Sequence, residues 1–70
     1  MIVYAVVEMY DGEFNVDVCG SLGKAIQAKE EYISGIEDFN YDICTDEERY
    51  FSAEINEMMY TVEIIEREIL

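Results

Sequence analysis

Two strand patterns that meet at a tight-turn signal constrain the fold of this chain more than any other feature. Residues 1–10 form a nearly continuous run of apolar, β-branched and tyrosine side chains, which is typical of a strand that is buried on both faces. Asp11-Gly12 supplies the residue types that favour a two-residue hairpin turn. Residues 13–19 then alternate between apolar and mostly polar side chains. The sequence therefore predicts an antiparallel hairpin at this end of the chain.

A helix is predicted directly after the hairpin. Ser21 suits an N-cap, and aliphatic side chains recur near one face between residues 22 and 34. Gly35 is a residue type at which helices commonly end. Lys24 and Lys29, two of the four basic residues, lie on the other face of this helix.

The last part of the chain favours two further strands. Residues 49–55 and 59–69 are rich in β-branched and aromatic side chains, which alternate with polar ones. A C-terminal helix that starts near Ala53 is the alternative, since Glu and Met dominate the next few positions. We therefore expect an α+β fold in one domain, residues 1–70. It would be a small antiparallel sheet with one helix packed on one face, in the order ββαββ.

The segment between the helix and these strands, residues 37–48, is the most acidic part of the chain. Phe39, Tyr41 and Ile43 alternate there with polar side chains, which also fits a short strand with these three residues turned inward. Residues 38–49 place oxygen donors at EF-hand loop positions one, three, five and nine. The sixth position requires Gly and the twelfth Glu, but they are Ile43 and Arg49. The sequence therefore predicts no calcium-binding loop.

Other chemical motifs are absent or incomplete. CGSLGKA at 19–25 lacks both the spacing and the hydroxyl residue of a phosphate-binding loop. Cys19 and Cys44 have no CxxC spacing and no histidine to accompany them, so two reduced thiols are expected. No pairing of a nucleophile with a base is visible. We expect no enzyme activity, no metal and no cofactor.

The net charge is unusual for a chain of this size. Seventeen acidic residues and four basic ones give −13, well beyond the roughly 2–8 units that solubility requires in a small domain. Such self-repulsion destabilises a compact state unless a partner compensates for it. No apolar run is long enough to cross a bilayer, and the first ten residues lack the basic segment of a secretory signal. We therefore expect a soluble protein of the cytoplasm.

Rows of carboxylates on strands would offer basic side chains the same kind of target as a nucleic-acid backbone. Duplex DNA carries one charge per about 1.7 Å of axis, and outward residues two apart on a strand lie about 6.6 Å apart. Exposed tyrosines would add contacts. We expect a binding protein that occupies the basic nucleic-acid-binding site of another protein and binds neither nucleic acid nor membranes itself. The predicted contact residues are Asp11, Glu13, Asp17, Glu37, Asp38, Tyr41, Asp42, Asp46, Glu47, Glu48 and Tyr50.

Two alternatives stay open at this point. The chain could be a small structural protein that self-associates, for example as a homodimer, through a sheet edge, with its acidity serving only solubility. It could also be a weak Ca²⁺-binding module. Reversal of the acidic charges distinguishes the three hypotheses, because only the protein that presents carboxylates to a basic site is expected to lose its partner.

The order of motifs resembles short ββα-type phage proteins. The resemblance rests on a first strand followed by DGE at 11–13, VDVCGSLGKAIQAKEEYI at 16–33 and YTVEIIEREI at 60–69. In size and charge the chain is similar to DNA-mimic inhibitors, including anti-restriction and anti-CRISPR proteins. These resemblances imply an anti-defence inhibitor in the cytoplasm of a host cell. They assign no functional role to any individual residue of this chain.

Overall fold

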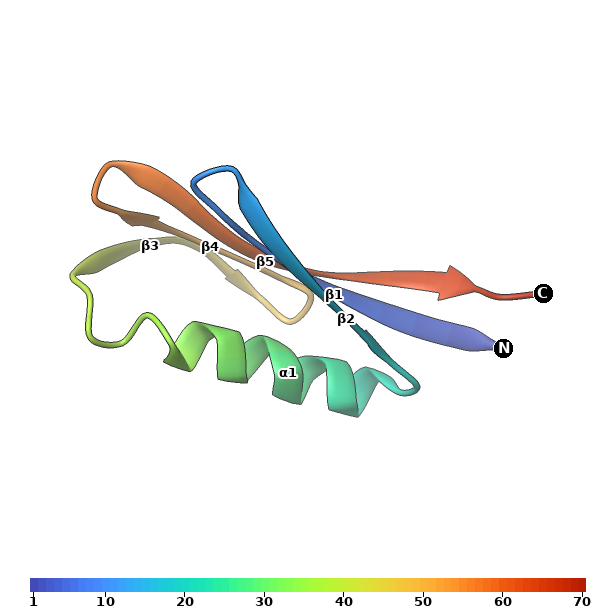
Figure 1. Cartoon of the computed structure of the whole chain (residues 1–70). Helices are drawn as coiled ribbons and strands as arrows, with labels where there is room; N and C mark the ends of the chain where they lie inside the picture. Colours follow the sequence, from blue (N-terminus) through green and yellow to red (C-terminus); the bar gives the residue numbers. More distant parts are fainter.

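A computed structural model of residues 1–70 shows a five-stranded antiparallel sheet with one helix across one face (Figure 1). The strand order across the sheet is β2-β1-β5-β4-β3, so β5 is central and β2 and β3 are the edges. The elements are β1 (Ile2–Tyr10), β2 (Glu13–Cys19), α1 (Leu22–Ser34), β3 (Tyr41–Glu47), β4 (Tyr50–Ile55) and β5 (Met58–Glu68).

The expected ββαββ order is wrong, because the chain has a fifth strand and its order is ββαβββ. The additional strand is β3, within the segment whose acidity is more typical of a loop. It is an edge strand that pairs with β4 alone, so its carboxylates remain in water while its backbone bonds to the sheet. The alternative C-terminal helix is also wrong, since residues 50–55 and 58–68 are strands.

The inward orientation expected for apolar residues in this segment is likewise wrong for two of them. Phe39 precedes β3 and is exposed. Ile43 lies on the helix side of β3 but is 56% exposed, because the edge strand extends beyond the region that α1 covers. Tyr41 is half-buried against the core.

Two of the three hairpins with two-residue loops close through residues with positive φ, and the Glu48-Arg49 loop between β3 and β4 is the exception. Asp11 and Gly12 have φ of 52° and 79°, and Asn56 and Glu57 have φ of 52° and 67°. Positive φ at both central positions gives a turn whose twist matches that of the flanking strands. The predicted hairpin over the first two strands is confirmed, with Tyr10 opposite Glu13.

The core lies between α1 and the sheet. Ser21 caps the helix, with its Oγ accepting a hydrogen bond from the Lys24 amide at 3.3 Å, so the predicted helix is confirmed. Val6 and Val62 are fully buried beneath it. The complete set of buried apolar residues is Val6, Ala25, Ile36, Phe51, Ala53, Ile55, Tyr60, Val62 and Ile64.

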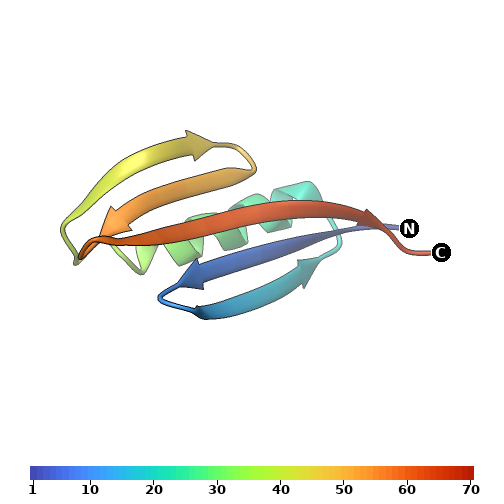
Figure 2. The same ribbon diagram turned by 90° about the horizontal axis from the view of Figure 1, so that it is seen from above.

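The opposite face of the sheet, hereafter the open face, has no covering element (Figure 2). The predicted burial of β1 on both faces is therefore wrong. Even-numbered β1 residues such as Val6 face α1, whereas Met9 is 49% exposed on the open face. In β2 the polar side faces the helix layer, and Phe14, Val16 and Val18 lie on the open face. The molecule is thus a slab of 41 × 22 × 17 Å with one covered and one uncovered side.

Candidate protein-binding surface

Few of the carboxylates are neutralised within the chain. Arg49 forms the two ion pairs of the structure, at 3.3 Å to Glu66 and 3.9 Å to Glu48. The other fifteen of the seventeen acidic side chains have no Lys or Arg nitrogen within 4 Å. Lys29 is buried, but its Nζ donates to the backbone carbonyl of Glu47 at 2.7 Å rather than to a carboxylate.

One side of the open face gathers acidic side chains from three neighbouring strands. Asp42 of β3 is directly opposite Glu54 of β4. Two rows further along these strands, beyond the uncharged row of Thr45, Ser52 and Thr61, Tyr50 has Glu47 on one side and Glu63 of β5 on the other. Directly opposed like charges destabilise a sheet by about 0.2–1 kcal/mol per pair. We call Asp42, Glu47, Glu54 and Glu63 the acidic half; its directly opposed pair, Asp42 and Glu54, costs stability that a cationic partner would restore.

The other side of the open face is apolar and uncharged. Phe14 is 67% exposed and Val18 is 68% exposed, and the β1 residues beside them are only half-buried. Isolated exposed apolar residues are ordinary, whereas a contiguous group is typical of an interaction site. The members of this apolar half are Val3, Ala5, Val7 and Met9 of β1 with Phe14, Val16 and Val18 of β2.

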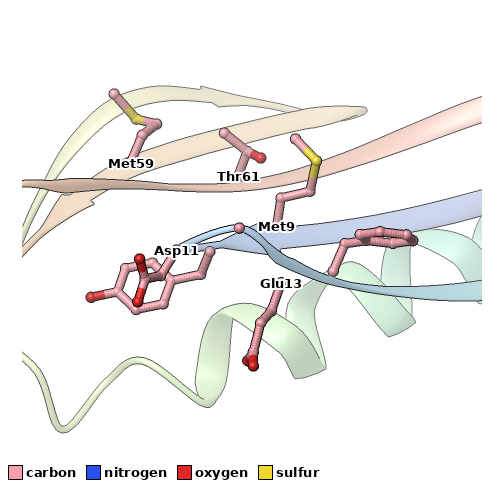
Figure 3. Close-up of a pocket in the computed structure, with 8 residues that line it drawn as sticks. Met9, Asp11, Glu13, Met59 and Thr61 are labelled. Carbon is pink, nitrogen blue, oxygen red and sulfur yellow. The ribbon is translucent and has the colours of Figure 1, made fainter.

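A shallow pocket of about 280 Å³ lies at the hairpin end of the apolar half. Met9 and Thr61 rise from β1 and β5 on the open face, and Met59 rises beside them (Figure 3). Tyr10 and Phe14 complete the apolar lining, and two of the predicted contact residues, Asp11 and Glu13, border the pocket as well. Methionine side chains adapt their shape readily, so the pocket can accommodate large apolar groups of different outline.

The predicted contact residues fall into separate places. Asp42, Glu47 and Tyr50 come together on the open face, whereas Tyr41 and Asp46 lie on the helix side of β3. Glu48 lies in the turn after β3. Glu37 and Asp38 lie in the connection after α1. The remaining three, Asp11, Glu13 and Asp17, belong to the hairpin at the β2 edge, four strand spacings or about 19 Å from β3.

Sequence reasoning missed two members of the acidic half and the whole apolar half. Glu54 and Glu63 each alternate with buried neighbours, so their outward direction was readable from the period-2 pattern. Their approach to Asp42 and Glu47 depends on the position of β3, which no local signal gives. The exposure of Phe14 could not be inferred, because alternation separates two faces without showing which one is covered.

Beneath the helix, tyrosine hydroxyls hold two further carboxylates. Tyr60 donates to Glu8 at 2.5 Å, and Asn15 donates to the other oxygen of Glu8 at 3.0 Å. Tyr32 donates to Asp17 at 2.7 Å. Burial, reinforced by the bond to Glu8, raises the pKa of Tyr60 far above its ordinary value. The hydrogen bond to Asp17 raises the pKa of Tyr32 to about 12. These pairs fasten α1 and β2 to the sheet.

We expect Tyr60→Phe to cost about 1–3 kcal/mol of unfolding free energy, because it leaves one carboxylate oxygen of the half-buried Glu8, Oε2, without a donor. Glu8→Met should cost less, because the single hydroxyl proton of Tyr60 can then be donated to the Tyr32 carbonyl, which lies 3.0 Å away. The double variant should be more stable than Tyr60→Phe alone. Urea unfolding of the four proteins gives this cycle, and additive effects would contradict the coupling.

We expect stability to fall as pH rises from about 10 to 12. A folded-state pKa raised above the ordinary value of about 10 contributes stability below pH 10, and this contribution is lost as pH rises through about 12, the pKa of Tyr32. Tyr32→Phe should therefore reduce the loss. Thermal melting between pH 9 and 12, with tyrosinate absorbance followed in parallel, measures it. An equally steep loss in the variant would assign the effect to other groups.

Comparisons with known proteins found no matching family model, no matching curated protein and no matching solved structure. The structure contains no cluster of three or more side chains arranged to hold a metal ion. Residues 41–47 are extended, so they do not wrap their oxygen atoms around a centre as a calcium loop does. The single helix is too short and too polar to span a bilayer.

Proposed function

We propose that this chain is a binding protein that occupies the basic nucleic-acid-binding site of another protein by presenting carboxylates in place of phosphates. The acidic half carries this proposal. Its four carboxylates lie on adjacent strands, and none of them forms an ion pair within the chain. Asp42 and Glu54 are one strand spacing of about 4.8 Å apart, and their row lies about 13 Å along the strands from the row of Glu47 and Glu63. Long Lys and Arg side chains of a partner can reach both rows, as they reach successive phosphates.

The charge distribution favours a protein partner over a nucleic acid or an anionic membrane. The net charge of −13 repels phosphate groups. The same charge increases the association rate with a basic protein and makes binding sensitive to salt concentration. The resemblance to small phage proteins extends the proposal to an anti-defence inhibitor that acts in the cytoplasm of a host cell.

Self-association through a sheet edge is the second candidate, and one contrast favours it. The β3 edge has a bulge between Ile43 and Thr45, a device that discourages further strand pairing. The β2 edge is regular and contains neither Lys nor Pro. In that case the chain would dimerise through β2 and its acidity would serve solubility.

The test is competitive capture. The immobilised chain is exposed to a lysate at low salt, and bound proteins are eluted with duplex oligonucleotide or with polyglutamate of equal total charge. The proposal expects nucleic-acid-binding proteins that the duplex releases at much lower concentration than polyglutamate. Equal release by the two polyanions would indicate simple ion exchange and would contradict mimicry.

A further inference from the structure

The two halves of the open face share one continuous surface and meet along β5. Val7 of the apolar half is the direct neighbour of Glu63 of the acidic half. The border between them is therefore a single strand spacing, about 4.8 Å wide. A partner that covers one half also reaches the other.

A second copy of this chain does not suit the surface. Each outward residue covers about 33 Å² of a flat sheet, the product of two residue rises and one strand spacing. The seven residues of the apolar half thus give roughly 230 Å² of flat area, well short of the about 800 Å² of accessible surface that each partner of a stable interface contributes. Any partner must therefore also cover part of the acidic half. If the contact between two copies extended over the whole open face, each acidic half would lie against a second chain that also has a net charge of −13. The charge therefore favours a basic partner over a second copy.

The dimensions of the apolar half match those of one helix. It is two strands or about 10 Å wide, and Val3 and Met9 are about 20 Å apart. A helix is 10–12 Å in diameter, and about 14 residues span 20 Å. On the opposite face of the sheet, the 13-residue helix α1 already covers the apolar side chains in this way (Figure 1). Helices are one of the usual ways in which a sheet buries an apolar face.

We propose that the open face binds a basic amphipathic α-helix of the partner protein. The apolar stripe of this helix lies along the apolar half, and one large apolar side chain enters the pocket beside Met9 and Phe14. Its Lys and Arg flank lies over Glu63, Glu54 and the rest of the acidic half. This inference rests on the proposed function and specifies it: the blocked element is a basic helix of the kind that enters the major groove of DNA.

The probe is an 18-residue peptide of Leu and Lys, arranged so that leucines form one helical stripe. A second peptide has the same composition in an order that spreads the leucines around the helix. Fluorescence anisotropy of each peptide is measured against the full chain at low and moderate salt. We expect the amphipathic peptide to bind at least tenfold more tightly, and equal binding of the two peptides would overturn the inference.

Two sets of variants separate this inference from the proposed function. Phe14→Thr with Val18→Thr removes apolar contacts from exposed strand positions that tolerate Thr. Asp42→Asn with Glu54→Gln and Glu63→Gln neutralises the acidic half. We expect the first set to weaken peptide binding at least tenfold at every salt concentration, and the second to weaken it mainly at low salt.

The outcomes are distinct. If only the neutralised variant loses affinity, the proposed function survives and the helix site on the apolar half is wrong. If neutralisation has no effect at either salt concentration, the proposed function itself fails at this face. Sedimentation velocity of the chain without peptide tests whether a second copy covers the open face, and we expect a monomer. A dimer that Phe14→Thr and Val18→Thr dissociate would make the second copy the occupant and overturn the inference. Circular dichroism verifies the fold of each variant.

Discussion

Replacement of Phe51 by Ala should remove a large part of the free energy of unfolding of the chain. Phe51 is 2% exposed beneath α1, and its ring packs edge-on to Tyr60 with centroids 6.4 Å apart. Removing a buried Phe side chain costs about 3–5 kcal/mol. A domain of 70 residues has roughly 4–10 kcal/mol of total stability. The loss therefore consumes much or all of the stability, and urea unfolding followed by far-UV circular dichroism measures it.

The same substitution at Phe14 is the matched control. Phe14 is 67% exposed on the open face, so its replacement by Ala should change stability by about 0.5 kcal/mol or less. Equal losses at the two positions would show that Phe14 is buried in solution. That result would mean that the open face is already covered, and it would contradict a free docking surface.

Charge reversal of the acidic half should abolish capture of a basic partner. Asp42→Lys, Glu54→Lys and Glu63→Lys replace three attractive contacts with three repulsive ones on adjacent strands. We expect affinity to fall at least 100-fold, which is about 2.8 kcal/mol at 1.4 kcal/mol per factor of ten. The amount of partner retained by the immobilised variant, measured at low salt, gives the result.

The control for this variant reverses three carboxylates away from the open face. Glu30 and Glu31 of α1 and Glu37 after it, each changed to Lys, also raise the net charge by six, from −13 to −7. Only the loss of long-range attraction should be seen, with a slower association rate and little change in dissociation. If both variants lost affinity equally, the loss would be caused by the change in net charge and not by the position of the carboxylates in the acidic half.

The parts of this fold that the sequence predicted are those with local causes. Asp11-Gly12 specifies its own turn, and Ser21 caps the next four residues of its own helix. β3 has no such local cause, because this edge strand is rich in Asp and Glu and acquires its extended conformation by pairing with β4. The acidic half depended on that pairing and was therefore only partly foreseen, through Asp42 and Glu47.

The open face was hidden from the sequence for a related reason. Val16 and Asp17 point to opposite sides of β2, and their pattern favours burial of the valine. In the structure both are exposed: Val16 lies on the open face, and Asp17 lies at the edge of the helix layer, where it accepts a hydrogen bond from the Tyr32 hydroxyl. Only the position of α1 over the sheet decides which face stays in water.

The central place of β5 has a consequence for how the chain is made. The β1–β2 and β3–β4 hairpins have no pairing with each other, and each joins the sheet only through β5, the last strand to be synthesised. An isolated two-stranded hairpin is at best marginally stable. Folding during translation is therefore postponed until residues 58–68 have left the ribosome, and acquisition of structure is a late, single event. Until then the nascent chain exposes the apolar residues of both hairpins, and its dense negative charge keeps those chains apart.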